Sequence, residues 1–400
     1  MATALNPLHR LWRLLPPRGR RRALLRAAVL LAPRPDQVPP PVREGVIVVG
    51  ELGRASGLGE GARLMLAGLA ALGVPAWTDA REAPPGAALL LHVNPPQVPL
   101  ALSRLGRRVV RGRRVIGFWN WELPVADPDW RIGAALVHEA WVASRFTAAA
   151  LEPLLPGRMH VVPYPLAVRP PAPSLLSRAA FGLPERAVVT LAVISLASSF
   201  VRKNPLAAIA AHRAAFGERT DRVLVLKVTD PDHFPQDFAR LRAACAGVAN
   251  IQVEARTLTR ADLHALMAAS DIVLSLHRSE GFGLVPAEAM LLGRAVAATD
   301  WSATAEFLHE EVAAPVPARL VPVEDPRGVY ALPGAAWAEP DVAAAASWLQ
   351  RLADDPALRA AMGAKARAAA LARFGPEALA SAVQRLGLPV PGGAAKDAAA

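Results

Sequence analysis

The sequence is poor in cysteine and has no long apolar run. Cys245 is the single cysteine among 400 residues, which excludes an intramolecular disulfide framework and most zinc sites. The apolar run from Ala27 to Ala32 is well short of the ~20 residues needed to span a bilayer. Residues 23–32 also make a poor signal-peptide core, because Arg26 interrupts them and Pro33-Arg34-Pro35 follows. We therefore expect a cytoplasmic protein, with peripheral attachment to the inner face of the membrane as the one form of membrane contact.

Negative charge is missing from the N-terminus, although the whole chain has a net charge of +11. The first acidic residue is Asp36, and leucines and Trp12 are interleaved with the arginines that precede it. This pattern predicts a basic arm, within residues 1–32, that lies on an anionic membrane surface. A disordered basic tail is the alternative reading. The same positive charge could also bind nucleic acid. No nucleic-acid recognition module accompanies the arm, so we expect no nucleic-acid partner.

Two proline-rich stretches divide the chain, at residues 33–41 and 169–173. A length of 400 residues suits two or three domains of ~150 residues. We expect the following parts: a basic arm and linker at 1–41, an N-terminal domain at 42–170, a C-terminal domain at 171–370, a helix at 371–388 that packs on the N-terminal domain, and a disordered tail at 389–400.

Short apolar runs alternate with helical patterns in both halves of the chain, as in parallel sheets buried on both faces. The sequence therefore predicts an α/β fold with two doubly wound domains. The expected strands are 45–50, 74–77, 88–94, 115–122, 140–146 and 160–165 in the first half, and 187–195, 223–228, 250–254, 271–276 and 295–299 in the second.

The stretch around Glu280 and Glu288 holds the strongest chemical signal. A buried strand, 271–276, leads into a glycine-containing loop. Proline is typical of a first helical turn, so we predict a helix that opens at Pro286 and ends near Gly293. Free amides at a helix N-terminus bind anions such as a diphosphate. The two carboxylates would repel phosphate and prefer hydroxyls. A diphosphate with hydroxyl-bearing rings at both ends describes a nucleotide sugar.

This stretch resembles the donor-site signature of retaining GT-B glycosyltransferases of the family 4 type, also called glycosyl transferases group 1. The likeness rests on Glu-x7-Glu with Gly-Phe-Gly-Leu between, and on Ala-Thr-Asp-Trp-Ser at 298–302. It implies a GT-B fold, with two Rossmann-like domains facing each other across a cleft and a C-terminal helix returning to the first. It also implies that Glu280 binds the donor sugar and acts in catalysis, that Glu288 binds the ribose, and that the diphosphate lies on the amides of the loop Gly281, Phe282, Gly283 and Leu284.

Cations near the loop would stabilise the charge that develops on a departing diphosphate. By the resemblance Lys203 is the catalytic cation, while Arg202 and Lys227 are further donor-binding candidates. Ala197 stands where many members of the family carry an arginine. Because protein cations do this work in the family, we expect neither a metal nor a cofactor.

The acceptor-side candidates lie in the first half of the chain. Gly57 and Gly59 match part of a dinucleotide fingerprint, but six residues separate Gly50, at the end of the strand, from Gly57, so we reject a dinucleotide site. A glycine-rich loop there also fits the family pattern, in which it lines the cleft. Asn94, Glu122 and His138 are the other candidates, each with an equally simple structural reading as a turn residue, a structural carboxylate or a locally bonded histidine.

The expected function is transfer of a sugar from a nucleotide sugar to a glycan or lipid-linked acceptor, with retention of configuration, in the synthesis of surface polysaccharide or glycoconjugates. Two alternatives stay open. One is a non-catalytic scaffold with weak nucleotide binding, suggested by Ala197 and by Ala303-Thr304. The other is a sugar-nucleotide epimerase, which would need further acid or base groups near the donor.

Overall fold

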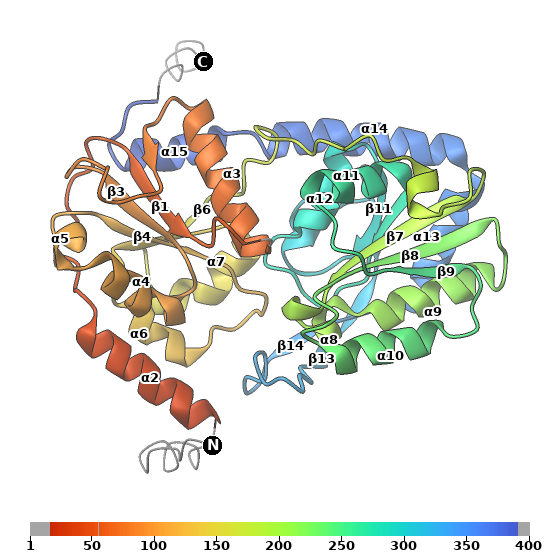
Figure 1. The fold of residues 1–400 in the computed structure, drawn as a ribbon, viewed down its shortest axis with the longest axis horizontal. Helices are drawn as coiled ribbons and strands as arrows, with labels where there is room; N and C mark the ends of the chain where they lie inside the picture. Colours follow the sequence, from red (N-terminus) through yellow and green to blue (C-terminus); the bar gives the residue numbers. More distant parts are fainter. Residues whose placement is uncertain (1–16, 55, 391–400) are drawn as a thin grey trace, which may run out of the picture.

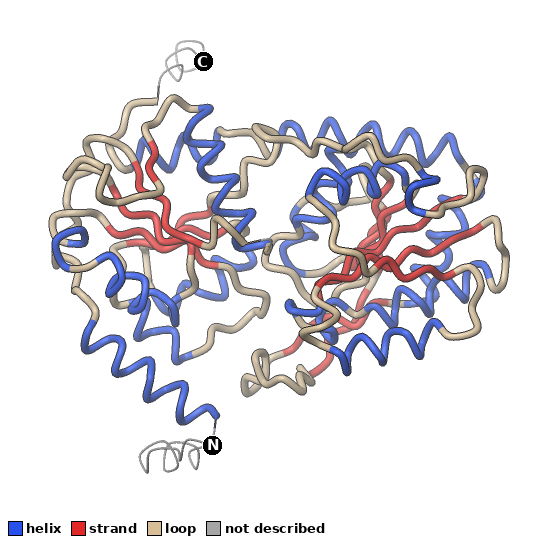
Figure 2. Tube along the Cα trace, in the orientation of Figure 1, coloured by secondary structure: helices blue, strands red, loops and turns tan. Residues whose placement is uncertain are grey.

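The computed structural model describes residues 17–54 and 56–390, with the side chains of residues 17–22 left out. It has two lobes, each built on a six-stranded sheet with helices on both faces (Figures 1 and 2). Arg10 and Arg13 of the predicted basic arm, and residues 391–400 of the predicted tail, lie outside the described residues.

The first sheet is parallel and has the order β2-β1-β3-β4-β5-β6. Its central strands read as unbroken apolar runs, and both of their faces are buried. The chain leaves β1 and β3 in opposite directions across the sheet, so the carboxyl ends of these two strands mark a topological switch point. The strands are β1 (Val46–Gly50), β2 (Ala76–Trp77), β3 (Ala88–His92), β4 (Val115–Trp119), β5 (Glu139–Val142) and β6 (Met159–Val161).

The second sheet is also parallel, with the order β12-β11-β10-β7-β8-β9. This is the doubly wound Rossmann order, and its switch point lies between β7 and β10. The loops after β7 and β10 therefore meet at the ligand-binding edge of the sheet. The strands are β7 (Val188–Ser195), β8 (Arg222–Thr229), β9 (Ile251–Glu254), β10 (Ile272–Ser275), β11 (Ala295–Thr299) and β12 (Ala314–Val316).

Helices connect the strands in both lobes, as the sequence pattern predicts. The helices of the first lobe are α3 (Gly57–Ala71), α4 (Val98–Leu105), α5 (Arg107–Val110), α6 (Arg131–Ala134) and α7 (Arg145–Leu151). Those of the second are α8 (Phe200–Lys203), α9 (Pro205–Phe216), α10 (Pro235–Cys245), α11 (Arg260–Ala269), α12 (Leu284–Leu291) and α13 (Val342–Asp354).

The C-terminal helices cross from the second lobe to the first. Helix α14 (Pro356–Arg373) runs along the second lobe, and α15 (Glu377–Arg385) packs against α3 (Figure 1). A side chain at Gly68 of α3 would come within 2.6 Å of Leu379 on α15, so this contact depends on a residue without a side chain. The predicted return of the last helix to the first lobe is confirmed.

A hairpin of the second lobe, β13 (Ala318–Pro322) with β14 (Ala336–Pro340), is not anticipated by the sequence pattern. Its loop carries Tyr330, whose ring centroid lies 5.8 Å from that of Trp121 in the first lobe. Tyr330 and Trp337 thereby join the apolar core of the first lobe. The hairpin thus connects the lobes on one side of the seam between them.

The N-terminal helix α2 (Pro17–Leu31) packs against α4 and α6. Its Leu25 is buried, whereas Leu24, Leu30 and Leu31 are exposed. Residues 17–31 are therefore an ordered helix with apolar groups left on its outer side, and the disordered-tail reading is wrong for them. In the described part of the chain, no helix combines the length and the hydrophobicity required to cross a bilayer.

Candidate functional site

Glu280 is held by two cations at the switch point of the second sheet. The Nζ atom of Lys203 lies 2.5 Å from Glu280 Oε1, and Arg202 Nη1 lies 3.2 Å from the same oxygen. Burial alone would raise the pKa of Glu280, but Lys203 and then Arg202 outweigh it and lower this pKa to about 2. Because both pairs use Oε1, the other carboxylate oxygen is the one left to accept a hydroxyl proton. The two predicted catalytic residues are thus brought together.

Arg202 is buried and contacts other protein groups rather than the surface where a ligand would bind. It is 3% exposed, and its Nη1 donates to the Ser279 carbonyl at 2.7 Å. The same guanidinium lies 3.8 Å from Glu122 of the first lobe and over the ring of Tyr330. Since Tyr330 also donates to Glu122 at 3.1 Å, a continuous set of contacts joins Glu122 to Glu280 across the seam.

The loop after Glu280 is pressed against the first lobe. The Ser144 hydroxyl donates to the Gly281 carbonyl at 2.8 Å, and the Thr147 hydroxyl lies 3.2 Å from it. A side chain at Gly281 would come within 2.7 Å of the Trp121 carbonyl. The loop therefore occupies the seam between the lobes.

Helix α12 begins at Leu284, so the prediction that Pro286 opens the helix is wrong. Proline occupies the third position instead, which it tolerates because first-turn amides have no intrahelical acceptor. Gly283 is the N-cap and has a φ of +98°, a left-handed conformation that suits glycine. No side chain caps the helix, so its first amides are available to an anion.

Buried His277 fixes the neighbouring loop. The Thr304 hydroxyl donates to the Trp301 carbonyl at 3.0 Å, so it accepts from His277 Nε2 at 2.9 Å. The Nδ1 atom then accepts from the Ser275 hydroxyl at 2.9 Å, and burial lowers the pKa of His277 to about 4, which keeps the ring neutral. This histidine is not among the residues predicted from the sequence, although a polar residue directly after a predicted buried strand was a usable signal.

Glu288 lies one turn into α12 and is 3% exposed. Arg260 Nη2 is 2.5 Å from its Oε1, and the same nitrogen is 3.1 Å from Glu60 of the first lobe. Burial raises the pKa of Glu288 to about 7, a shift that Glu60 reinforces and Arg260 opposes. Both glutamates of the predicted pair therefore lie at the seam. Neither Glu60 nor Arg260 is among the residues predicted from the sequence. The usable signal for Glu60 was an ionisable residue inside the glycine-rich start of α3, and Arg260 has no such signal.

Lys227 is not brought together with this cluster in the described structure. Its ammonium donates to the carbonyls of Val228 at 2.9 Å and Arg256 at 2.8 Å, at the ends of β8 and β9. Burial lowers its pKa. This geometry describes a cation that caps strand carbonyls, and it gives no support for a role in holding phosphate.

The predicted acceptor-side residues fall into two places. A Cβ built at Gly57 would lie 3.8 Å from Leu284 Cδ1, and one at Gly59 would come within 2.4 Å of the Arg54 carbonyl. The glycine-rich start of α3 therefore lies beside the start of α12. Asn94 accepts from the Asn120 amide at 2.8 Å, also at the carboxyl edge of the first sheet.

His138 lies at the opposite edge. Its Nδ1 accepts from the amide of Val115, the first residue of β4, at 2.8 Å, and its Nε2 bonds the Asp36 carbonyl at 2.9 Å. Both ring nitrogens serve the backbone. The locally bonded reading of His138 is therefore the one that the geometry supports.

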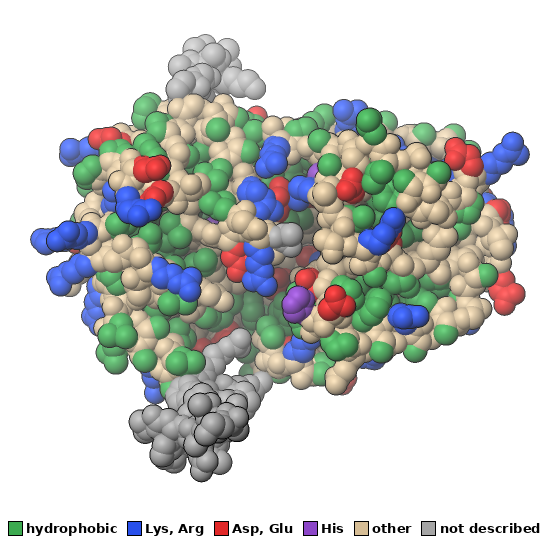
Figure 3. All heavy atoms as spheres, in the orientation of Figure 1, with side chains coloured by type: hydrophobic (Ala, Val, Ile, Leu, Met, Phe, Trp, Pro, Cys, Tyr) green, Lys and Arg blue, Asp and Glu red, His purple; other side chains and the backbone are tan. Residues whose placement is uncertain are grey.

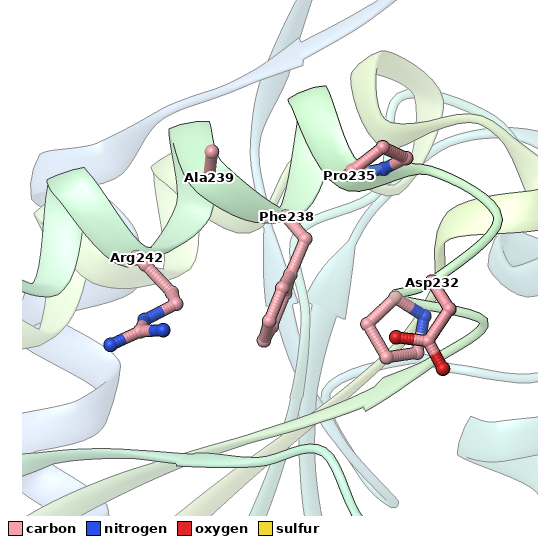
Figure 4. A pocket seen from close by; sticks show the side chains of 6 residues that line it. Asp232, Pro235, Phe238, Ala239 and Arg242 are labelled. Atoms are coloured by element: carbon pink, nitrogen blue, oxygen red, sulfur yellow. The ribbon is translucent and has the colours of Figure 1, made fainter.

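The molecular surface also shows charged side chains at the seam between the lobes. Figure 3 shows side chains of both charges gathered along a hollowed seam between the two lobes. A separate hollow of about 500 Å³ lies on α10 of the second lobe, where Phe238 points into the opening between Asp232 and Arg242 (Figure 4). None of its lining residues belongs to the cluster at the seam. Within residues 17–54 and 56–390, no group of three or more metal-ligating side chains is found.

Comparisons with known proteins agree with the resemblance seen in the sequence. Residues 197–331 match the family model described as "Glycosyl transferases group 1". This segment contains the whole Glu280 cluster of the second lobe. No curated protein sequence matches the chain at a significant level.

Solved structures match over most of the chain. HepE from Anabaena, in complex with UDP and glucose, shares 14% identity with a TM-score of 0.61, over 86% of this chain and 99% of that one. A glycosyltransferase from Rickettsia africae shares 13% identity with a TM-score of 0.62, and the match covers 86% of this chain and 98% of that one. Sucrose-phosphate synthase from Thermosynechococcus elongatus shares 19% identity with a TM-score of 0.54, and the match covers 75% of this chain and 72% of that one. The protein therefore has the GT-B fold of glycosyltransferases, and segment 197–331 of its second lobe matches the glycosyl transferases group 1 family.

Proposed function

We propose that this protein is a retaining glycosyltransferase that moves a sugar from a nucleoside-diphosphate sugar to a glycan or lipid-linked acceptor. The observation that carries the proposal is the buried, ionised Glu280 with Lys203 2.5 Å away, at the switch point of the second sheet. An anionic oxygen for a sugar hydroxyl and a cation for a leaving phosphate stand side by side there. The complexes of Anabaena HepE with UDP and glucose, and with UDP-glucose, support a nucleotide-sugar donor.

The donor would lie along the loop from Glu280 to Glu288. Its sugar hydroxyls donate to Glu280, its diphosphate accepts from the first amides of α12, and its ribose hydroxyls meet Glu288. As the bond from the anomeric carbon to the diphosphate breaks, negative charge develops on the diphosphate. Lys203 is positioned to stabilise that charge, in a site where such stabilisation is usually the largest catalytic effect.

The acceptor would approach from the first lobe. Glu122 is 22% exposed at its side chain and is held by Tyr330 and Arg202, so one of its oxygens can orient an acceptor hydroxyl towards the donor sugar. Holding both substrates at one seam removes much of the entropic barrier to their reaction. Gly57 and Asn94 line the same edge of the first sheet.

The N-terminal helix supports an acceptor at a membrane surface. Helix α2 exposes Leu24, Leu30 and Leu31, and exposed Arg26 lies one turn before Leu30. Helix α2 packs on α4, which leads into α5 with its exposed Arg107 and Arg108. Apolar and basic groups together favour an anionic bilayer. We propose that the protein works at the cytoplasmic face of a membrane, in the synthesis of surface polysaccharide or glycoconjugates.

The test is to incubate the purified chain with UDP-, GDP- and ADP-sugars, with water as the acceptor, and to follow nucleotide release and the anomer of the freed sugar by NMR before it mutarotates. Release with a retained configuration is expected for one donor. An inverted product would overturn retention. Binding without turnover for every donor would favour the scaffold reading, and an isomerised nucleotide sugar would favour the epimerase.

A further inference from the structure

His264 lies close to Glu288 but does not bond it. Its Nε2 atom is 3.9 Å from Glu288 Oε2, beyond the ~2.7–3.2 Å of a hydrogen bond. The two residues come from neighbouring helices of the second lobe, α11 and α12 (Figure 1). Arg260 pairs with the other oxygen of Glu288, Oε1, at 2.5 Å. The carboxylate therefore presents Oε2, and not Oε1, to the imidazole.

The orientation of the His264 ring is fixed from its other side. Its Nδ1 accepts the amide proton of Ala172, in the linker between the lobes, at 3.1 Å. Burial, helped by Arg260, lowers the pKa of His264 to about 4, so the ring is neutral near pH 7. A neutral imidazole that accepts at Nδ1 carries its hydrogen on Nε2. The nitrogen next to Glu288 is therefore a hydrogen-bond donor.

This donor has no partner in the part of the chain that the structure describes. His264 is 4% exposed, and its Nε2 is a buried atom without a hydrogen bond. Leaving a buried donor unpaired is unfavourable, so a ligand group that pairs with Nε2 gains affinity.

A hydroxyl group matches both atoms. It can donate to Glu288 Oε2 and accept from His264 Nε2 at the same time. One oxygen can lie at hydrogen-bond distance from both atoms when they are 3.9 Å apart. A methylene group in the same place could do neither, and a site built to bond a hydroxyl discriminates strongly against a ligand that lacks it.

We propose that His264 is a further binding residue of the nucleotide site, which donates from Nε2 to a ribose hydroxyl held by Glu288 Oε2 and so selects ribonucleotides over deoxynucleotides. The inference rests on the proposed function, which puts the ribose at Glu288. Arg260 keeps Oε1 throughout, so no ion pair has to move. The Arg260 side chain is 34% exposed, and the cluster opens to solvent on that side.

Two amide substitutions separate the roles of the two ring nitrogens. In His264→Asn the amide oxygen can replace Nδ1 as the acceptor for Ala172, but nothing replaces Nε2. In His264→Gln the longer side chain brings an amide nitrogen to the place of Nε2, and the contact with Ala172 is lost. His233→Asn, at an exposed histidine of the same lobe, is the control. His264→Phe is a second variant without a donor, in case His264→Asn does not fold.

The experiment measures nucleotide affinity by calorimetry with the purified chain. Titrations with UDP, GDP and ADP select the nucleotide, and its 2′-deoxy and 3′-deoxy forms are then compared with it. Work at pH 8 keeps Glu288, whose pKa burial raises to about 7, mostly ionised. The readout is the ratio of the affinity for the ribonucleotide to that for each deoxynucleotide. A purely structural role of His264 would weaken all three ligands alike and leave this ratio unchanged.

We expect the parent and His233→Asn to prefer the ribonucleotide over one of the two deoxynucleotides. His264→Asn should reduce that preference about three- to tenfold, the size of one hydrogen bond, and His264→Gln should keep most of it. An unchanged preference in His264→Asn, or an equal loss in the Asn and Gln variants, would overturn the inference. So would equal affinity of the parent for the three forms. In each of these cases nucleotide still binds and the proposed function stands. If the parent binds none of the three nucleotides, both fall.

Discussion

Lys203 Nζ lies 2.5 Å from Glu280 Oε1, although 77 positions separate the two residues in the chain. The loops after β7 and β10 bring them together, because these strands flank the point where the second sheet changes direction. Pairing lowers the pKa of Glu280 despite its burial. One contact thus places an anionic oxygen and a cation together at the inter-lobe seam, as the proposed function requires.

Replacing the cation should impair chemistry more than stability. We expect Lys203→Met to lower kcat/KM for the nucleotide sugar about 100- to 1,000-fold, as for other removed groups that stabilise transition-state charge. Lys365→Met, an exposed lysine on α14, is the matched control. Equal kcat/KM values for the two variants would remove Lys203 from the reaction.

The raised pKa of Glu288 predicts that the stability of the folded protein depends on pH. Its pKa in the folded protein is raised from 4.5 to about 7, so folding favours the protonated form. Stability from this group is full below pH 4.5 and is lost as the pH rises towards 7, by an upper limit of about 3 kcal/mol for 2.5 pKa units. Glu288→Gln should lack this loss. Thermal unfolding at pH 5 and pH 8 measures it: the wild-type midpoint should fall relative to the variant, and parallel behaviour would contradict the prediction.

Gly283 should tolerate no side chain. Alanine there would take a φ of +98° and bring its Cβ within 2.4 Å of Thr304 Cγ2, so we expect Gly283→Ala to lose at least about 1–2 kcal/mol of stability from the backbone conformation alone. Donor binding should weaken with it. Gly53→Ala, with open space around it, is the control in urea unfolding. Equal stability of Gly283→Ala and the parent protein would show that the loop adjusts freely.

The outer side of α2 predicts membrane binding. Changing Leu30 and Leu31 together to serine should reduce flotation of the full chain with vesicles that contain anionic lipid, because both side chains are about 80% exposed. Leu175→Ser, which removes a fully exposed leucine elsewhere, is the control. Flotation that is unaffected by the double change, or absent in the parent, would argue against this surface.

Much of the architecture could be predicted from the sequence, because both sheets are built from apolar runs with clear boundaries. The strand before Glu280 and the glycines after it defined the donor loop. The start of α12 was misplaced because Pro286 suits every position of a first turn, whereas the left-handed Gly283 cap has no equally specific signal.

Contacts between the lobes could not be predicted in the same way. Tyr330 lies in the loop of a hairpin without a regular apolar period, and its partner Glu122 is 208 positions away. Glu60 on α3 and Arg260 at the start of α11 belong to different lobes and meet only where the lobes pack together. Lys227 looked like a phosphate ligand because a lysine ends a buried strand, but its ammonium bonds strand carbonyls instead.

Glu280→Gln tests the central claim most directly. The amide keeps the size of the side chain but cannot pair with Lys203 as an anion or accept a sugar hydroxyl with the same strength. With circular dichroism showing a folded variant, transfer and hydrolysis of the nucleotide sugar should fall about 100-fold or more. Rates equal to those of the wild type would show that Glu280 does not hold the donor sugar and would contradict the account.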